Sequence, residues 1–317
     1  MSFRIVSIGG YVPPKVVTND DMESLVDTTD AWIVERTGIR ERHVCEMETT
    51  SDLAYEAAKI CLERGNTKPE ELDLILCATV SPEYVTPTVS CMLQNYLGAT
   101  CPALDINAAC SAFIYMLDTA EAFFMTGRYK KILIVGAERL SGVTDWTDRS
   151  TCVIFGDGAA ALLLEKGDNY LVSKLVTAGG DNVIKIPNFN GNSPFYKREQ
   201  LRPYTHMNGQ ETYKFAVKSM VKDLQDVIAK AGLTEQDIDC VVPHQANLRI
   251  IDAAKKRLDI PDDRFHWNID RYGNTSAASI PLVLNELVEN GDLNRGDLVA
   301  LAAFGGGLSS AACILRW

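Results

Sequence analysis

Three residues of types that take part in catalysis stand where apolar segments end or begin. Cys110 follows a strand-like segment, 102–106, and opens a run, 111–125, that is apolar on almost every side. His244 follows a short apolar segment, and Asn274 lies in a loop that leads into another apolar run. A thiol, an imidazole and a carboxamide brought to one site favour nucleophilic catalysis, in which the sulfur attacks a carbonyl.

The position of Cys110 favours the reactive form of its side chain. A helix that is apolar all round is buried, and its first turn leaves backbone N–H groups without partners and a partial positive charge. A cysteine at that point is biased toward the thiolate, so we expect a lowered pKa. The small neighbours Ala108, Ala109, Ser111 and Ala112 leave room for a substrate.

Each of the three residues also has an ordinary structural interpretation. Most unpaired cysteines are small core residues, and this chain has nine cysteines. A histidine such as His244 is often satisfied in the core by a backbone carbonyl, and Asn274 suits a helix N-cap, which asparagine favours. For each residue alone the structural interpretation is preferable, but the joint occurrence of all three favours chemistry.

Composition restricts the class of protein. The chain has 317 residues and a net charge of −11, which argues against a nucleic-acid binder, since such proteins need a basic face for phosphates. Its cysteines include no C-x-x-C pair and its four histidines no H-x-x-x-H pair, so we expect neither a disulfide framework nor a metal site. No apolar run approaches the roughly 20 residues of a membrane span. We therefore expect a soluble, cytoplasmic protein without a membrane or nucleic-acid partner.

Landmarks that recur along the chain predict an internal duplication. The strand-like segment 72–80 resembles 238–244 in its apolar character and in the helix, glycine and Thr-containing turn that precede it. Alternating strand and helix patterns favour two packed α/β layers. We expect an N-terminal half, 1–168, which carries the cysteine, and a C-terminal half, 169–317, which carries the histidine, the asparagine and a Gly-rich turn.

The alignment of the two halves also predicts how the site is assembled. It places Cys110 and Asn274 at equivalent helix starts, so two helix N-termini would face one site from opposite halves. Apolar spacing predicts a helix over 213–231. The polar segment 179–208 is long for a loop inside a compact domain, which is typical of a lid or a binding wall.

Six motifs spread over the whole chain point to one family. They are Asp30-Ala-Trp-Ile-Val-Glu-Arg-Thr-Gly-Ile-Arg-Glu-Arg, Ala108-Ala-Cys, Phe155-Gly-Asp-Gly-Ala, Pro243-His-Gln-Ala-Asn-Leu-Arg-Ile, Gly273-Asn-Thr-Ser-Ala-Ala-Ser and Phe304-Gly-Gly-Gly. Together they resemble the β-ketoacyl-acyl-carrier-protein synthase III family, the condensing enzymes that start bacterial fatty-acid synthesis. The resemblance implies a thiolase-like α/β fold, an internally duplicated five-layer αβαβα sandwich, and a homodimer.

The resemblance assigns chemical roles residue by residue. Cys110 would attack an acyl-CoA thioester, and the backbone N–H groups of Cys110 and Gly306 would bind the developing oxyanion. His244 and Asn274 would donate hydrogen bonds to the enolate formed when a malonyl group on the carrier protein loses CO₂. The implied reaction is a decarboxylative Claisen condensation that yields a β-ketoacyl-acyl-carrier protein, with acyl-CoA as a substrate and no cofactor.

Two sets of binding residues follow from the same resemblance. The implied CoA-binding residues are Trp32, Arg36, Arg149 and Asn247. The implied carrier-protein patch, which would steer an acidic partner, consists of Lys214, Arg249, Lys256 and Arg257. Without the resemblance, Trp32 would be interpreted as a core aromatic residue and the charged residues as solvated surface. For Lys256 and Arg257 this structural interpretation is as good as the functional one.

The acyl pocket is implied at Thr86 and Phe304, and here the chain departs from the family. The family often has a bulky aromatic residue at the place of Thr86, where it reaches across the dimer into the acyl pocket. A smaller side chain predicts a longer or wider pocket and hence a starter larger than acetyl. Leu308-Ser-Ser follows the Gly-rich turn, where the family commonly continues with aromatic residues.

Three other functions stay open from the sequence. One is a condensing enzyme or acyltransferase of secondary metabolism that uses an unusual acyl group or acceptor. The others are a cysteine hydrolase and a scaffold that binds acyl-CoA or carrier protein without catalysis. The intact set of Cys110, His244 and Asn274 argues against the scaffold. Turnover of malonyl carrier protein would separate a condensing enzyme from the hydrolase and the scaffold.

Overall fold

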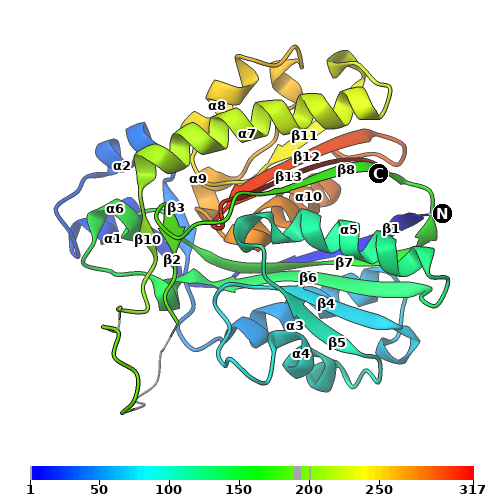
Figure 1. Cartoon of the computed structure of the whole chain (residues 1–317), viewed down its shortest axis with the longest axis horizontal. Helices are drawn as coiled ribbons and strands as arrows, with labels where there is room; N and C mark the ends of the chain where they lie inside the picture. The colour runs from blue at the N-terminus through cyan, green and yellow to red at the C-terminus, as the bar shows by residue number, and fades with distance from the viewer. Residues whose placement is uncertain (1, 189–193, 200) are drawn as a thin grey trace.

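The chain folds into five stacked layers in which helices and sheets alternate (Figure 1). The structure, a computed structural model, describes residues 2–188, 194–199 and 201–317. Three layers of helices enclose two sheets, and the two chain termini lie near each other at one end of the stack (Figure 1). This arrangement confirms the predicted αβαβα sandwich.

The first sheet comes entirely from the N-terminal part of the chain. In spatial order its strands are β1 Ser2–Tyr11, β7 Asp157–Gly167, β6 Lys131–Arg139, β4 Leu74–Ala78 and β5 Ala103–Ile106. β4 pairs in parallel with β6 and β5, whereas β7 runs antiparallel to both of its neighbours. All of β4 is buried, as expected for a strand covered on both faces.

The second sheet repeats this pattern with strands from the C-terminal part. Its strands are β8 Tyr170–Thr177, β13 Ser309–Arg316, β12 Leu298–Gly305 and β11 Cys240–Pro243. The first two pairings are antiparallel and the third is parallel, as in the series β1, β7, β6, β4. A single bridge between Val241 and Phe265 lies beyond β11, in the place that β5 occupies in the first sheet.

Helices cover both sheets and separate them. The outer helices are α3 Thr50–Arg64 and α4 Val89–Leu97 on the first sheet, and α7 Gly209–Lys230 and α8 Leu248–Lys255 on the second. The central layer contains α5 Ala112–Met125 and α10 Ser279–Asn290. α5 contacts strands of both sheets, and half of its residues are buried, which confirms that the run after Cys110 forms a helix packed in the interior.

Short helices and strands complete the fold. The short helices and strands are α1 Asn19–Glu23, α2 Asp30–Thr37, α6 Arg149–Cys152, α9 Ile269–Tyr272, β2 Val16–Thr18, β3 Glu41–His43, β9 Ile184–Lys185 and β10 His206–Met207. The one-turn 3₁₀ helices are η1 Pro69–Glu71, η2 Ala109–Ser111, η3 Leu140–Val143, η4 Glu235–Asp237, η5 Asp262–Arg264 and η6 Ser276–Ala278.

The distribution of strands supports the division into two halves. Every strand of the first sheet ends by residue 167, and every strand of the second begins at residue 170 or later. We therefore propose a boundary at 168/169, between β7 and β8. α7 begins at Gly209, earlier than the predicted 213, because the Asn208 side chain accepts a hydrogen bond from Glu211 N at 3.2 Å and caps the helix.

The predicted equivalence of Cys110 and Asn274 is wrong. Cys110 is the second residue of η2, which leads into α5, and the second residue of η6, which leads into α10, is Ala277. Asn274 corresponds instead to Asn107. In both halves the asparagine Oδ1 accepts a hydrogen bond from the backbone N–H two residues later, at 3.1 Å in the first half and 2.8 Å in the second.

Candidate active site

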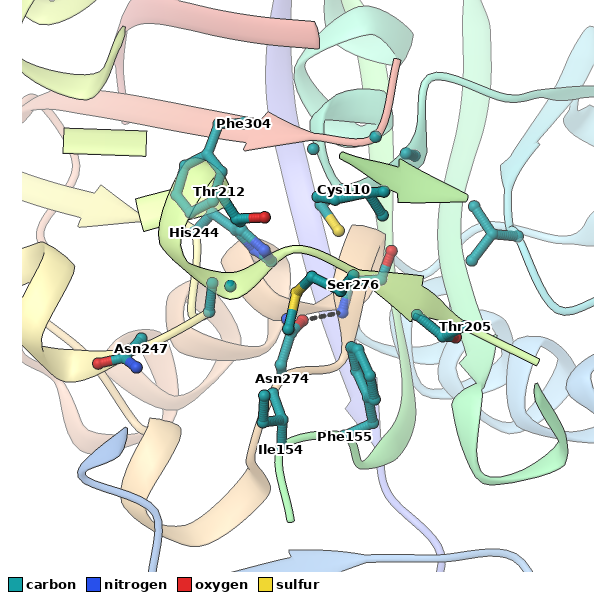
Figure 2. Close-up of a pocket in the computed structure, with 18 of the residues that line it drawn as sticks. Cys110, Ile154, Phe155, Thr205, Thr212, His244, Asn247, Asn274, Ser276 and Phe304 are labelled. Atoms are coloured by element: carbon teal, nitrogen blue, oxygen red, sulfur yellow. Dashed lines mark hydrogen bonds between the residues drawn. The ribbon is translucent and has the colours of Figure 1, made fainter. Parts of the chain in front are cut away.

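One cavity gathers the three candidate residues. Its volume is about 1270 Å³, and both halves of the chain contribute to its walls. Cys110 comes from the central layer, His244 from the end of β11 and Asn274 from the segment before η6, and the three side chains converge on the same space (Figure 2). The cavity therefore brings a nucleophile and two hydrogen-bonding groups to one reaction space.

The backbone around Cys110 is held by two unusual local features. Ala109 has φ +49°, in the left-handed region that few residues other than glycine adopt. On the other side, a Cβ added to Gly305 would lie 2.7 Å from Cys110 N, so only glycine fits at the end of β12. The Gly-rich turn 305–307 thus lies against the backbone of Cys110, which is the arrangement that the predicted oxyanion site needs.

His244 is fixed by its backbone and by one ring nitrogen. The backbone N–H of His244 donates to Ala302 O at 2.8 Å, and the ring nitrogen Nδ1 lies 2.7 Å from Ser279 Oγ. Since Ser279 Oγ also accepts a long contact of 3.5 Å from Gln245 N, its own proton is available for Nδ1. This arrangement favours the tautomer in which Nε2 carries the proton and acts as the donor.

Burial keeps the His244 ring neutral. The side chain is almost fully buried, and the Phe304 ring packs edge-on at 5.2 Å between centroids. Burial lowers the pKa of His244 from its usual 6.5 to about 3, because a charged ring would lose its hydration. At neutral pH His244 is therefore a hydrogen-bond donor and not a source of positive charge.

Asn274 is held so that its amide nitrogen is the free end. Its backbone N–H donates to Ile154 O at 2.9 Å, and its carbonyl accepts from Gly156 N at 3.1 Å. Its Oδ1 accepts from Ser276 N, the bond drawn in Figure 2. With the oxygen engaged, the Nδ2 hydrogens remain to donate into the cavity.

The expected low pKa of Cys110 is not what the structure shows. Burial raises the pKa of the Cys110 thiol from 9.0 to about 12, and the Ser276 hydroxyl, which favours the thiolate, offsets this only in part. Cys110 is half-buried and lines the cavity, and α5 begins at Ala112, so the helix start is offset from the cysteine. In the resting site the cysteine is a thiol.

The residues predicted to hold CoA lie together at one end of the cavity. The guanidinium of Arg36 is 4.8 Å and that of Arg149 is 4.9 Å from the centre of the Trp32 ring. Trp32, Arg36 and Asn247 line the cavity, and Arg149 lies just outside it. The Asn247 side chain already links α8 to α2, since its Nδ2 donates to Arg36 O at 2.9 Å.

The predicted carrier-protein patch divides into two parts. Lys214 on α7 and Arg249 on α8 are exposed and line the cavity, and Arg249 lies 5.9 Å from the Tyr213 ring. Lys256 and Arg257 are exposed at the end of α8 and lie outside the cavity. Arg249 and Lys256 are seven residues apart, so they share a face of the helix about 10 Å apart.

Comparison with known proteins decides the family. Models described as 3-oxoacyl-[acyl-carrier-protein] synthase III and its C-terminal part match residues 104–179 and 228–317. The β-ketoacyl-[acyl-carrier-protein] synthase III of Clostridium acetobutylicum is 46% identical over 100% of this chain and 99% of its own length, and that of Geobacillus kaustophilus is 47% identical over 100% and 99%. The crystal structure of the Aquifex aeolicus 3-oxoacyl-[acyl-carrier-protein] synthase III superposes with a TM-score of 0.93 at 42% identity over all of both chains.

The chain belongs to the β-ketoacyl-[acyl-carrier-protein] synthase III family. It is therefore an acyl-transferring condensing enzyme with the thiolase-like fold, and the resemblance drawn from its motifs is confirmed. No helix among the described residues is long and apolar enough to cross a bilayer. The same residues contain no cluster of three or more His, Cys, Asp or Glu side chains arranged to hold a metal ion.

The two residues predicted to form the acyl pocket of this synthase III chain lie in different places. Phe304 is buried and lines the cavity beside His244. Thr86 is exposed, on a loop with the exposed side chains of Tyr84 and Val85, and it does not line the cavity of its own chain. Its predicted role therefore requires a second copy of the chain.

The segment between β8 and α7 forms part of the cavity wall, as its length suggested. β9 and β10 pair with each other, and Ile184, Thr205 and Met207 line the cavity. Within the predicted wall 179–208, residues 189–193 and 200 lie outside the described residues.

Sequence reasoning missed the residues that support the reacting groups. Ser279, the partner of His244, and Ser276, beside Cys110, both belong to the Gly273-Asn-Thr-Ser-Ala-Ala-Ser motif, which was a usable signal. Arg42 is fully buried and donates to Val153 O and Asn19 Oδ1, each at 2.9 Å. It thereby fixes the turn that binds the backbone of Asn274, but its place in an Arg-rich motif gave no sign of burial.

Substituting Gly305 by alanine should lower the rate of Cys110 acylation by about 100-fold, because the new methyl group would displace Cys110 N and misplace the sulfur. The measurement is the single-turnover rate of acylation by acyl-CoA, followed by intact mass. Gly179→Ala is the control, since no atom lies within 4 Å of an added Cβ there. An unchanged rate for Gly305→Ala would show that the turn 305–307 shifts to accept the methyl group without moving the cysteine, which would contradict the prediction.

His244 should make the enzyme less stable in acid. Its folded-state pKa of about 3 lies below the 6.5 expected when unfolded, so between these values the unfolded chain binds a proton that the folded chain excludes. The free energy of unfolding should therefore fall as pH falls below 6.5, by about 1.4 kcal/mol per pH unit from this residue. Urea unfolding at pH 5 and 7 should show a smaller loss in His244→Gln than in the wild type, whereas equal losses would contradict the assignment.

Proposed function

We propose that this chain condenses an acyl-CoA starter with malonyl-acyl-carrier protein and so begins type II fatty-acid synthesis. The observation that carries the proposal is the convergence of Cys110, His244 and Asn274 on one cavity, against the Gly-rich turn. The curated relatives with more than 40% identity over the whole chain bear the name of this synthase. The route needs no cofactor, because each step is carried by a side chain or a backbone N–H.

The first half-reaction transfers the acyl group to Cys110. The sulfur attacks the thioester carbonyl of the acyl-CoA, the C–S bond to CoA breaks, and an acyl-cysteine forms. The backbone N–H groups of Cys110 and Gly306 stabilise the oxyanion, since the Gly-rich turn lies in contact with the cysteine backbone. The CoA thiolate leaves with a proton as free CoA.

The second half-reaction forms the new carbon–carbon bond. Loss of CO₂ from malonyl-acyl-carrier protein leaves an enolate, whose oxygen accepts hydrogen bonds from His244 Nε2 and Asn274 Nδ2. The enolate carbon attacks the acyl-cysteine carbonyl, and the Cys110 thiolate is released. Neutral donors suit this step because they stabilise the enolate without protonating it, and burial keeps His244 neutral.

CoA would bind along the end of the cavity at Trp32. The Trp32 ring offers its face to the adenine and Arg36 its charge to a phosphate. Arg149 already packs at 4.9 Å from that ring, so it must move outward if the adenine is to lie between the two. Its side chain is 46% exposed and held by Asp27, which leaves it room to do so. Asn247 would support this site by holding the Arg36 backbone.

Two protein partners follow from the surface. Lys214 and Arg249 at the cavity, with Lys256 and Arg257 just after the end of α8, would attract an acidic carrier protein to a chain that is acidic overall. A second copy would pair with the free edge of β5, where Leu104 is exposed. The homodimer would bring Thr86 of one copy to the acyl pocket of the other. Nine free cysteines suit a reducing cytoplasm.

A panel of acyl-CoA starters with malonyl-acyl-carrier protein tests the proposal. The expected products are a β-ketoacyl-acyl-carrier protein and one CO₂ for each condensation, with the highest rate for a starter larger than acetyl. Release of free fatty acid without condensation would indicate a hydrolase. Transfer of the acyl group to another acceptor without loss of CO₂ would indicate an acyltransferase of secondary metabolism.

A further inference from the structure

A buried carboxylate with a free oxygen lies behind the nucleophile. Glu138, near the end of β6, is completely inaccessible to solvent. Its Oε2 accepts hydrogen bonds from Ser81 Oγ at 2.6 Å, Thr79 Oγ1 at 3.1 Å and Val80 N at 3.0 Å, whereas its Oε1 has no hydrogen-bond partner among the described residues. An unsatisfied buried carboxylate oxygen is costly, so a function for it is to be expected.

A buried hydroxyl without a partner faces the same place. Ser276 Oγ is inaccessible and unpaired among the described residues, and Ser276 has φ +47°, a strained value for a residue with a side chain. A Cβ on Gly136 would lie 2.7 Å from Ala277 O, so this face of β6 packs directly on η6. Glu138 is two residues along the strand and points to the same face, toward Ser276.

The Ser276 hydroxyl lies between the cysteine and the carboxylate. It is close enough to lower the pKa of both the Cys110 thiol and the Glu138 carboxyl, although neither contact has the geometry of a full hydrogen bond. The Glu138 charge in turn acts on the Cys110 thiol. Figure 2 shows Ser276 beside Cys110 on the cavity wall. The Ser276 hydroxyl is therefore placed to link the cysteine and the carboxylate.

The acylation step lacks another suitable proton acceptor. Cys110 is a thiol in the resting site and must lose its proton as the sulfur attacks. His244 has its Nδ1 engaged by Ser279, and burial lowers its pKa to about 3, so it is a poor base. Burial raises the pKa of the Glu138 carboxyl above the usual 4.5, which makes this carboxylate a better base than His244.

We propose that the Ser276 hydroxyl passes the Cys110 proton to Oε1 of Glu138 as the cysteine is acylated. Ser276 receives the thiol proton and gives its own to the carboxylate, while the C–S bond to Cys110 forms and the C–S bond to CoA breaks. The proton then returns from Glu138 by the same hydroxyl to the CoA thiolate, which leaves as free CoA, and Glu138 is a carboxylate again. The inference rests on the proposed acylation of Cys110.

Glu138→Gln separates proton transfer from simple electrostatics, because the two predict opposite changes. The amide oxygen can keep the three bonds that Oε2 accepts, so the surrounding loop should hold. If Glu138 accepts the proton, single-turnover acylation by Glu138→Gln at pH 7 should be about 100-fold slower than in the wild type. Its rate should then rise about tenfold per pH unit, because hydroxide takes the place of the missing carboxylate as the base. If Glu138 acts only through its charge, its removal lowers the thiol pKa and acylation becomes faster, which overturns the proposal.

Two serine variants provide the matched comparison. Ser276→Gly removes the relay hydroxyl and relieves the strained φ, so it should slow acylation like Glu138→Gln and show the same steeper pH profile. Ser111→Ala removes a buried hydroxyl next to Cys110 that donates instead to Ser309 O at 3.3 Å, and it should keep the wild-type profile. A wild-type profile in Ser276→Gly would exclude the relay.

The experiment distinguishes failure of the inference from failure of the proposed function. Intact mass first shows whether the wild type becomes acylated at Cys110 by acyl-CoA. If it does not, the proposed function fails. If it does, and Glu138→Gln acylates at the wild-type rate or faster, only the relay fails. Decarboxylation of malonyl-acyl-carrier protein by Glu138→Gln should remain at the wild-type rate, since His244 and Asn274 are unchanged.

Discussion

Cys110→Ala is expected to abolish acylation by acyl-CoA and to lower condensation by a factor on the order of 10⁴ or more. The alanine removes the atom that forms the covalent intermediate, and none of the other cysteines lines the cavity that contains His244 and Asn274. Intact mass after incubation with acyl-CoA should show the acyl adduct on the wild type and none on the variant. The fold should persist, because alanine fills most of the same small volume.

Cys91→Ala is the control for this substitution, since Cys91 is the exposed cysteine and the first to react with an added thioester by chance. It should leave the adduct in place. Cys110→Ala should still decarboxylate malonyl-acyl-carrier protein, because its two hydrogen-bond donors are intact. An adduct that persists in Cys110→Ala and disappears in Cys91→Ala would remove the assigned nucleophile.

The layered fold was predictable because it depends on patterns that short segments carry by themselves. α5 is apolar on almost every side, and a position between two sheets is where a helix can bury more than one face. β4 and β11 are wholly apolar, as parallel strands with both faces covered must be. The recurrence of these segments indicated the duplication before any contact between them was known.

The details of the site were less predictable because they depend on contacts between the halves. The sequence aligned Cys110 with Asn274 as two helix starts, but Cys110 lies inside the one-turn 3₁₀ helix η2, whereas Asn274 precedes its counterpart η6, and no propensity indicates either helix. The thiol pKa was expected to fall from a local helix effect. It rises instead, because the opposite half covers the sulfur and desolvation outweighs a partial charge two residues away.

The supporting residues show the same limit. Glu138 lies 28 residues after Cys110 in sequence, and its side chain reaches the site only because β6 packs on η6 from the other half. The predicted role of Thr86 depends on contacts still farther away, since it requires a second chain. Cys110, His244 and Asn274, which stand in the motifs, all line the cavity, whereas Glu138 and Arg42, which act through packing, gave no sequence signal.

Asn274→Ala and His244→Ala are expected to separate the two half-reactions. Each removes one donor to the enolate oxygen, so decarboxylation of malonyl-acyl-carrier protein should fall by about 10²- to 10³-fold. Acylation of Cys110 should remain, because the oxyanion of that step is bound by backbone N–H groups. The paired measurements are the intact-mass rate of acylation and the release of labelled CO₂.

Asn107→Ala is the matched control that the duplication provides. Asn107 makes the same bond to the backbone two residues later as Asn274 does, at 3.1 Å, but it precedes the cysteine. If Asn274 acted only by shaping its turn, Asn107→Ala would disturb the site equally, and both variants would lose both steps. Because Asn274 also presents its amide nitrogen to the enolate, only Asn274→Ala should lose decarboxylation, while any effect of Asn107→Ala should fall on acylation.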